Sequence, residues 1–177
     1  GKMGDSTPQY KLNVSLRECA NYGEVSSSES SSYLGGIIGY LEDGIYDNPY
    51  NSAVENCYNS GSIPSDVDEN TGGIVGLAAN HSMTAKCVNY GNVPYGNGIM
   101  GTDEGNGEYE DCYTLEGTYI SGDVWPKSVH VFTASQMSDS NYWEKETSLN
   151  MSETWRMNNG RAELTKCPFQ YVSAPTN

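Results

Sequence analysis

The stretch NCYNSGSIPSDVDENTGGIVG, from Asn56 to Gly76, contains two short patterns that recur along the chain. The first is Cys-x-Asn-x-Gly-x-Ile and the second is Gly-Gly-Ile-Val-Gly. Copies of the pair lie at residues 19–39 and 87–101, and a shortened copy begins at Cys112. Repetition of this kind decides the architecture, because stacked repeats bury a continuous core that no single repeat can form alone.

The distance between copies varies, whereas each motif keeps its length. The opening cysteines recur after 38, 30 and 25 residues, at Cys19, Cys57, Cys87 and Cys112. Repeat solenoids behave in this way because their stacked strands are constant while insertions go into surface loops. The sequence therefore predicts an all-β fold, namely a β-solenoid (β-helix-like) repeat array.

We expect both motifs to form strands. In the first, Cys57, Asn59, Gly61 and Ile63 alternate along the sequence, and alternate side chains of a strand lie on one face. Stacking in register would then produce an inward ladder of cysteines and another of asparagines. A buried Asn amide needs hydrogen-bond partners, and it can find them in the next repeat or in a bend at the following Gly.

The paired motif resembles the GLUG repeat, which is named for Gly-Leu-hydrophobic-Gly and has Ile in the second position here, as at residues 73–76. The resemblance covers about residues 17–120. Repeats similar to it occur in bacterial surface and secreted proteins, including adhesin-like proteins and immunoglobulin A peptidases. The resemblance implies an architecture and not an activity, because the repeat carries no catalytic residue and the sequence has no His-Glu-x-x-His zinc motif.

The composition favours a thin β-structure with a narrow core. Only 36% of the 177 residues are hydrophobic, 20 are Gly, and 14 Tyr stand against two Phe. This density of Gly argues against helices in the repeats, since each interior Gly costs a helix about 1 kcal/mol relative to Ala.

The pattern changes along the chain and predicts three parts. Residues 1–9 are a polar, disordered lead, residues 10–120 hold the solenoid repeats, and residues 121–177 form a C-terminal capping segment. The cap should contain a short helix that begins at Thr133 or Ser135 and a hairpin around Asn159-Gly160. We expect Trp143 and Trp155 to cover the open end of the solenoid, where unpaired strand edges invite association.

The charge excludes several kinds of partner. The net charge is −14, from 23 acidic and nine basic residues. Nucleic acids and anionic lipid surfaces both require basic patches, so neither is expected to bind directly. No apolar run reaches 18 residues, so this segment should not insert into a membrane. We expect a monomeric piece of a longer exported protein, located outside the cell or on its surface.

The five cysteines should be free thiols. Four of them occupy the same repeat position, which indicates packing, because Cys behaves as a small buried hydrophobe. Neighbouring repeats would bring them within reach of a disulfide, so pairing is not excluded by geometry. No Cys-x-x-Cys occurs, and a structural zinc site is not expected.

The tyrosines are candidate ligand-binding residues. Tyr22, Tyr58 and Tyr90 recur in the first motif, and they could line an exposed aromatic strip with Tyr33, Tyr40, Tyr46 and Tyr50. An extracellular glycan or a host or partner protein could use such a strip, because Tyr combines an apolar body with a polar tip. The alternative is that these rings flank the strands and pack on neighbouring coils.

One acidic loop is a candidate metal site. Asp66, Asp68 and Glu69 place three carboxylates within four residues, which suits oxygen ligation of Ca²⁺. The loop lacks the order of an EF-hand, and the alternative is a solvated surface loop. No other cofactor is expected.

These features predict a non-catalytic β-solenoid module of a bacterial cell-surface or secreted protein, which acts as an adhesive surface or a spacer. The alternatives are a carbohydrate-binding or carbohydrate-processing β-helix and a Ca²⁺-dependent adhesin. An enzyme is not expected, because the acidic residues lie dispersed on variable loops without catalytic partners in motif spacing.

Overall fold

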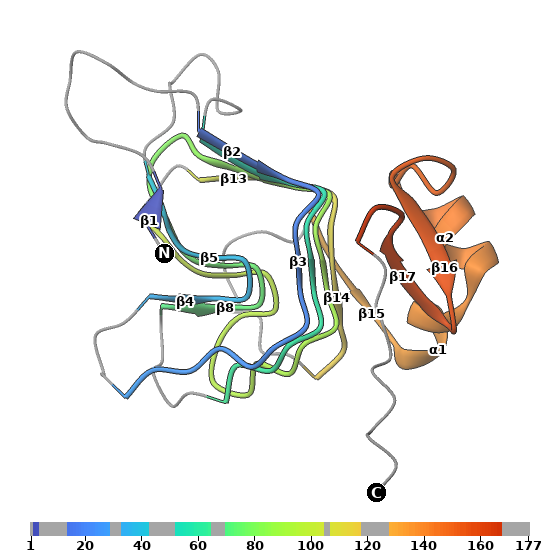
Figure 1. Cartoon of the computed structure of the whole chain (residues 1–177), viewed down its shortest axis with the longest axis horizontal. Helices are drawn as coiled ribbons and strands as arrows, with labels where there is room; N and C mark the ends of the chain where they lie inside the picture. Colours follow the sequence, from blue (N-terminus) through green and yellow to red (C-terminus); the bar gives the residue numbers. More distant parts are fainter. Residues whose placement is uncertain are drawn as a thin grey trace, which may run out of the picture.

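The computed structural model of the chain is built mainly of short β-strands (Figure 1). It describes residues 2–3, 14–28, 33–42, 52–64, 70–104, 107–117 and 128–167. Figure 1 looks along the stack of repeats, so that equivalent strands of successive repeats lie nearly behind one another. The first two repeats pass through the same four sheets in the same order, and the predicted all-β character is confirmed.

Two parallel sheets hold the strands around the first motif. Sheet B consists of β2 (Val14–Arg17), β6 (Ser52–Glu55), β10 (Met83–Ala85) and β13 (Glu108–Glu110). Sheet C consists of β3 (Ala20–Asn21), β7 (Tyr58–Asn59), β11 (Val88–Asn89), β14 (Cys112–Leu115) and β15 (Val129–Phe132). The shortened fourth copy predicted at Cys112 thus joins the stack as β13 and β14.

Two further parallel sheets hold the second motif. Sheet A consists of β1 (Lys2–Met3), β5 (Ile38–Leu41), β9 (Val75–Ala78) and β12 (Met100–Asp103). Sheet D consists of β4 (Leu34–Gly35) and β8 (Thr71–Gly72), and Asn97 continues it as a single bridge to Gly72. Part of the predicted disordered lead is therefore paired, because β1 lies in register with Tyr40 and Leu41.

The second motif is a bend and not the single strand that the sequence predicted. The chain leaves sheet D at Gly72, turns at Gly73 and Ile74, and returns in sheet A from Val75. A Cβ on Gly72 would fall on the carbonyl oxygen of Val75, and one on Gly73 would fall on that of the next repeat, at Gly98. The glycines are needed because two backbone segments touch where any side chain would stand between them.

The predicted asparagine ladder is confirmed. Asn59 Oδ1 accepts the Gly61 backbone N–H at 3.1 Å, and its Nδ2 donates to the Gly61 carbonyl at 3.0 Å. The same Nδ2 donates to Asn89 Oδ1 at 2.8 Å, while Asn59 Oδ1 accepts from Asn21 Nδ2 at 2.9 Å. Each amide therefore closes its own bend and links its repeat to the next. The ladder ends at Thr114, whose Oγ1 accepts from Asn89 at 3.4 Å.

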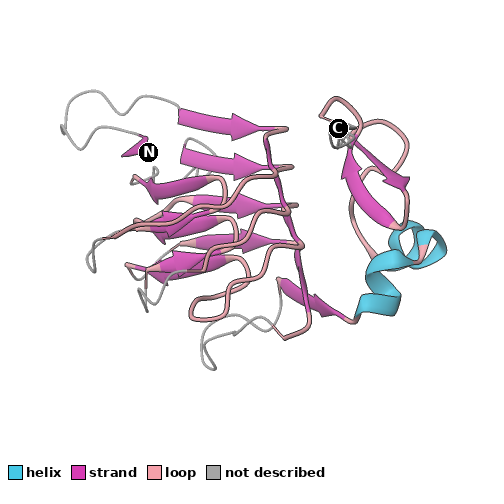
Figure 2. Ribbon diagram, turned by 60° about the horizontal axis from the view of Figure 1, so that its bottom comes forward, coloured by secondary structure: helices cyan, strands magenta, loops and turns pink. Residues whose placement is uncertain are grey.

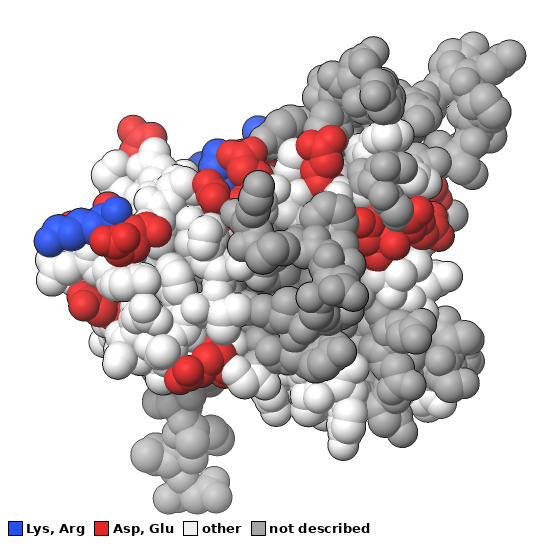
Figure 3. Space-filling view, turned by 180° about the vertical axis from the view of Figure 1, so that it is seen from behind, with Lys and Arg blue, Asp and Glu red and all other residues white. Residues whose placement is uncertain are grey.

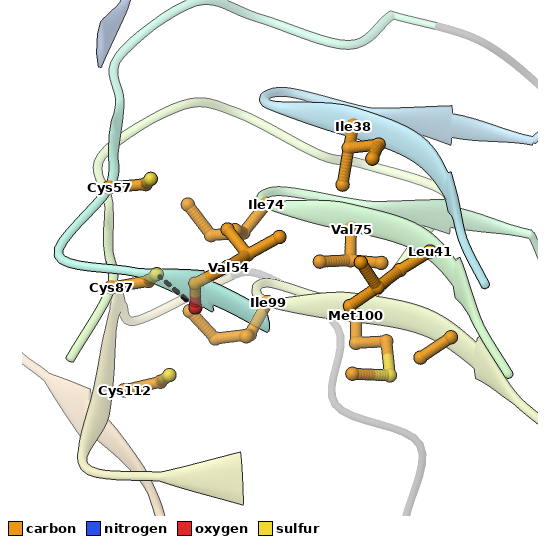
Figure 4. Close-up of a cluster of buried hydrophobic side chains, with 11 residues drawn as sticks. Ile38, Leu41, Val54, Cys57, Ile74, Val75, Cys87, Ile99, Met100 and Cys112 are labelled. Atoms are coloured by element: carbon orange, nitrogen blue, oxygen red, sulfur yellow. Dashed lines mark hydrogen bonds between the residues drawn. The ribbon is translucent and has the colours of Figure 1, made fainter. Parts of the chain in front are cut away.

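The cysteines stack as predicted (Figure 4). Cys57, Cys87 and Cys112 are fully buried, and all five cysteines of the chain are free thiols. Each buried thiol reaches a backbone carbonyl, as Cys87 does at Ala85 (3.2 Å). Burial raises the pKa of the Cys87 thiol well above its ordinary value, which keeps the group protonated and unreactive. Apolar side chains fill the rest of this core, among them Val54, Ile74, Val75 and Ile99.

A left-handed residue forms the corner between sheets B and C in every repeat. Four residues directly before the opening cysteines have positive φ: Glu18 (53°), Asn56 (51°), Lys86 (52°) and Asp111 (48°). This regular corner was not predicted from the sequence. Ion pairs link the same region between repeats, as between Arg17 and Glu55 at 3.1 Å.

The C-terminal segment contains the predicted helix and hairpin. A capping box at Thr133 begins α1 (Ala134–Ser138), and α2 (Ser140–Glu146) follows directly. The strands β16 (Trp155–Asn158) and β17 (Arg161–Leu164) pair antiparallel around Asn159 and Gly160, which have φ of 49° and 74°. These angles fit the type I′ turn that favours Asn-Gly.

The predicted position of the two tryptophans is wrong. Figures 1 and 2 show the C-terminal helices and hairpin beside the stack, on the outer face of sheet C. Trp155 lies edge-on to Tyr58 at 6.5 Å, and Trp143 lies edge-on to Tyr113 at 5.4 Å. At the end of sheet C the covering element is instead β15, which pairs with β14. The outer face needed a cover because its Tyr58, Val88 and Tyr113 are large and apolar.

Candidate binding surface

The tyrosines of the first motif lie in an internal interface. Tyr58 is only 1% exposed, and its ring centroid lies 5.7 Å from that of Tyr22 and 5.6 Å from that of Tyr90. The expectation that these rings pack on neighbouring coils is therefore confirmed. Tyr58 is covered by the C-terminal segment, and Tyr22 and Tyr90 are half-buried against the same cluster.

Hydrogen bonds complete this interface. Tyr22 donates its hydroxyl to the Cys167 carbonyl, and Tyr90 donates to the Met137 carbonyl at 3.2 Å. The Tyr90 oxygen also accepts the Ala162 backbone N–H at 2.9 Å. Burial raises the pKa of Tyr22 to about 12 and raises that of Tyr90 further, so both hydroxyls stay neutral donors at ordinary pH.

The candidate calcium ligands Asp66, Asp68 and Glu69 lie outside the described residues. Within the part of the chain that the structure describes, no group of three or more His, Cys, Asp or Glu side chains is arranged to hold a metal ion. The described helices are also too short to cross a membrane.

The structure exposes a different pair of tyrosines. Tyr33 is 44% exposed and Tyr95 is 58% exposed. Both stand three residues before the middle glycine of their motif, Gly36 and Gly98, and Asn70 has the same place before Gly73. The register of sheet D places Tyr33 beside Asn70, because Gly35 pairs with Gly72, and Tyr95 lies in a turn two residues before Asn97, which bridges to Gly72. We call this alignment of Tyr33, Asn70 and Tyr95 the outer row.

A second row lies next to the outer row. Tyr40, Leu77 and Thr102 pair in register in sheet A, and each follows its outer-row residue by seven positions. In the first repeat the two rows touch, since the ring centroids of Tyr33 and Tyr40 lie 5.4 Å apart. The intervening glycine bend fixes this distance, because its backbone segments pack without side chains between them.

The two rows contain no charged residue, although the chain has a net charge of −14. Elsewhere acidic side chains are spread over the surface and basic ones are sparse, as the face in Figure 3 shows. Phenol hydroxyls and an amide both donate and accept hydrogen bonds, and the rings offer apolar faces. The outer row can therefore bind a neutral, polar molecule that also has apolar faces, whereas Leu77 of the second row is buried.

Sequence reasoning included Tyr33 and Tyr40 among the candidates but missed Asn70 and Tyr95. The missing signal was positional. All three outer-row residues lie three positions before the middle glycine, yet Tyr95 and Asn70 differ in chemistry and so did not stand out as a repeat.

Comparison with known families gives one match. Residues 30–63 match the family model of the GLUG motif. The chain carries the GLUG motif. The matched segment contains β4, the first glycine bend, β5, β6 and β7 and ends at Ile63, so it links two neighbouring repeats. Neither a curated protein nor a solved structure matches the chain.

The GLUG motif explains how the rows are held. Its glycine bend carries Tyr33 on one side and Tyr40 on the other, and its inner corner at Gly36 touches the Asn59 amide of the ladder. In the copy at residues 72–76 the corner at Gly73 likewise touches the Asn89 amide, and the copy at residues 97–101 pairs with it in register. A rigid buried framework thus carries a variable outer row.

Proposed function

We propose that the repeats form a β-solenoid and that the chain is a non-catalytic adhesive module of a bacterial cell-surface or secreted protein. The observation that carries this proposal is the uncharged outer row, in which Tyr33 and Tyr95 are exposed and Asn70 is half-buried, and which rests on hydrogen-bonded repeats. Exposed aromatic side chains on a rigid support suit recognition, because little conformational entropy is lost on binding.

The solenoid assignment is supported by the pairing. Sheets A, B, C and D are parallel throughout, and each receives its strands from successive repeats. The amide ladder runs through the same repeats and ends where Thr114 replaces Asn. Such one-dimensional stacking forms extended surfaces on which one position recurs at a regular spacing.

A non-catalytic role agrees with the placement of several described acidic residues. Glu55 pairs with Arg17, Glu110 with Lys86, and Glu163 with Arg156. These carboxylates link strands or repeats, which gives them a structural use. Recognition requires only the outer row.

An extracellular location agrees with the surface and with the thiols. The acidic surface favours solubility, and full burial protects Cys57, Cys87 and Cys112 from oxidants. A spacer role is the second candidate, favoured by the regular stack itself, and it would need no binding surface.

Adhesion can be tested with beads coated with the complete chain. Beads should attach to bacterial or epithelial cells, and the double variant Tyr33→Ala/Tyr95→Ala should lose most of this attachment. Val131→Ser is a matched control, because Val131 is 46% exposed on β15, outside both rows. Attachment that is absent for the unchanged chain, or equal for all variants, would reject the adhesive function and leave the spacer.

A further inference from the structure

The geometry points to a neutral polysaccharide as the ligand of the outer row, with the sugar chain running along the stacking direction of the repeats. Tyr33 and Tyr95 would each stack on one sugar ring, and Asn70 would bind hydroxyls between them. This inference rests on the proposed adhesive function and names the chemical class of its ligand.

The charge of the chain argues for a neutral ligand. Acidic residues outnumber basic ones by 23 to nine, so an anionic polymer would be repelled along the whole surface. A cationic ligand would be drawn to carboxylates, yet all six positions of the two rows are uncharged. The ligand is therefore expected to be polar but uncharged, because such a molecule is not repelled by the acidic surface and needs no carboxylate in the rows.

The spacing argues for a ligand that repeats along one direction. Tyr33 lies in the first repeat and Tyr95 in the third, and Asn70 lies between them in the second. Neighbouring strands lie about 4.8 Å apart, so the two tyrosine positions are separated by roughly 10 Å. An extended sugar chain presents flat apolar ring faces and hydroxyl groups in alternation, which suits two rings separated by an amide.

The support of the row is rigid at its centre. The Leu34 backbone N–H donates to the Asn70 carbonyl at 2.9 Å, which ties the first two repeats together beside the row. Buried Leu34, Ile63 and Val93 form a small core next to it. The backbone beside Tyr33 and Asn70 is therefore held in place without a ligand, and binding does not require it to become ordered.

The row is narrow, and this argues against a protein as the ligand. A stable protein interface buries on the order of 1,200–2,000 Å² around a compact apolar centre. Here two rings are separated along a line, and the residue between them is polar. One extended chain can use this arrangement in full, whereas a globular partner would contact it in part.

The first test measures binding to defined sugars. Affinity electrophoresis would use soluble xylan and hydroxyethyl cellulose as neutral probes and alginate as an acidic probe. We expect retardation by at least one neutral probe and none by alginate. Calorimetry with oligosaccharides of the retained polymer should then show affinity that rises steeply once the oligosaccharide is long enough to reach both rings.

The second test uses variants of the row. Tyr33→Ala and Tyr95→Ala should each weaken binding of the long oligosaccharide about tenfold, as expected for the loss of one aromatic contact. The two alanine variants should bind short oligosaccharides with equal affinity. Asn70→Tyr should strengthen binding. Val131→Ser should change nothing. All these side chains are at least partly exposed, so circular dichroism and the melting temperature should be unchanged.

The outcomes separate the inference from the adhesive function. Absence of binding to neutral probes, or binding that ignores Tyr33 and Tyr95, would overturn the inference. If beads still attach to cells through the same two tyrosines, the adhesive function survives with a ligand of another class. If neither sugars nor cells are bound, both proposals fail.

Discussion

The two faces of sheet C differ in the parts of the chain that they contact and in the kind of contact that they make. The inner face carries the same residue types in successive repeats, and its Asn side chains form one hydrogen-bonded ladder through Asn21, Asn59 and Asn89. The outer face carries Tyr58, Val88 and Tyr113, which share no pattern and pack on the C-terminal segment. Contacts that recur in each repeat therefore hold the stack together, whereas contacts that occur only once hold the C-terminal segment on its outer face.

This difference has a consequence for stability. On the inner face, removing one group leaves donors and acceptors unsatisfied in two neighbouring repeats, so damage spreads along the stack. On the outer face, removing one ring weakens the attachment of a segment that has its own helices and hairpin. Variants on the two faces should differ in both the size and the extent of their effects.

The largest effect is expected at a glycine of the inner face. A Cβ on Gly61 would fall on the Gly23 carbonyl oxygen and lie 2.7 Å from Asn21 Nδ2. Neither group can move without opening the ladder, so Gly61→Ala should cost about 4 kcal/mol or more. Urea unfolding followed by circular dichroism would measure this loss.

Gly23 offers a matched control at the same motif position. Its repeat is the first of the described stack, and a Cβ there would meet only Asn21 Oδ1, at an ordinary 3.8 Å. Gly23→Ala should therefore change stability by less than about 1 kcal/mol. Equal losses for the two variants would show that contact between repeats is not what requires glycine.

A smaller and more local effect is expected on the outer face. Trp155 is fully buried against Tyr58, and its Nε1 donates to Asn56 Oδ1 at 3.0 Å. Trp155→Ala should cost about 3 kcal/mol, by loss of apolar contact and a cavity. The C-terminal segment should then detach at lower urea concentration than the repeats unfold.

The measurement compares two signals. With Trp125 replaced by Phe in both chains, the fluorescence of Trp143 in Trp155→Ala should report the C-terminal segment, and far-ultraviolet circular dichroism should report mainly the strands. Trp155→Phe keeps a ring but loses the hydrogen bond to Asn56, so it should cost less than the alanine variant. A single coincident transition in Trp155→Ala would mean that the segment and the repeats unfold as one unit.

The same comparison explains which features the sequence predicts. The inward ladder was predicted from the alternation of Cys57, Asn59 and Gly61, because periodic burial leaves a periodic pattern. The hairpin and helix cap were predicted from local turn and capping chemistry at Thr133 and Asn159. In each case a local or repeated signal was sufficient.

The features that were missed depend on contacts without a sequence period. The position of Trp155 beside Tyr58 joins residues far apart in the chain, so neither residue alone indicates the other. The bend at Gly73 was mistaken for a strand, because its cause is the backbone of the neighbouring repeat. The outer row was missed in part because one position holds Tyr33, Asn70 and Tyr95 in turn.

Replacing one buried hydroxyl within the stack should stabilise the chain, in contrast to the destabilising substitutions above. Thr84 is fully buried between Val54 and Tyr109 in sheet B, and its Oγ1 has no hydrogen-bond partner within the described part of the chain. Replacing it with the isosteric Val removes an unsatisfied polar group, so Thr84→Val should stabilise the chain by about 1 kcal/mol. Thermal unfolding would detect this as a rise in the melting temperature.

Thr114 is the matched control for that prediction. It is equally buried, but its Oγ1 accepts from Asn89 Nδ2 at the end of the ladder. Thr114→Val should therefore destabilise the chain by about 1–2 kcal/mol, since the Asn89 donor loses a partner. If both variants shift stability in the same direction, hydrogen bonding of the hydroxyl does not decide the effect.

The smallest effect is expected at the left-handed corners, where four residues of different chemistry adopt one conformation. Lys86 has φ of 52°, a region that disfavours ordinary side chains by about 1 kcal/mol and that Asn tolerates better. Lys86 also pairs with Glu110 at 3.2 Å, but this partly exposed pair is worth only about 0.2–1 kcal/mol. Lys86→Asn should therefore give a net gain of about 0.5 kcal/mol.

Lys86→Ala loses the ion pair and keeps the strain, so it should be less stable than Lys86→Asn by about 1 kcal/mol. In high salt, where the ion pair of the unchanged chain is screened, the gain of Lys86→Asn over the unchanged chain should rise toward about 1 kcal/mol, because backbone strain does not depend on ionic strength. Equal stability of Lys86→Asn and Lys86→Ala would mean that the corner conformation imposes no selection on its residue.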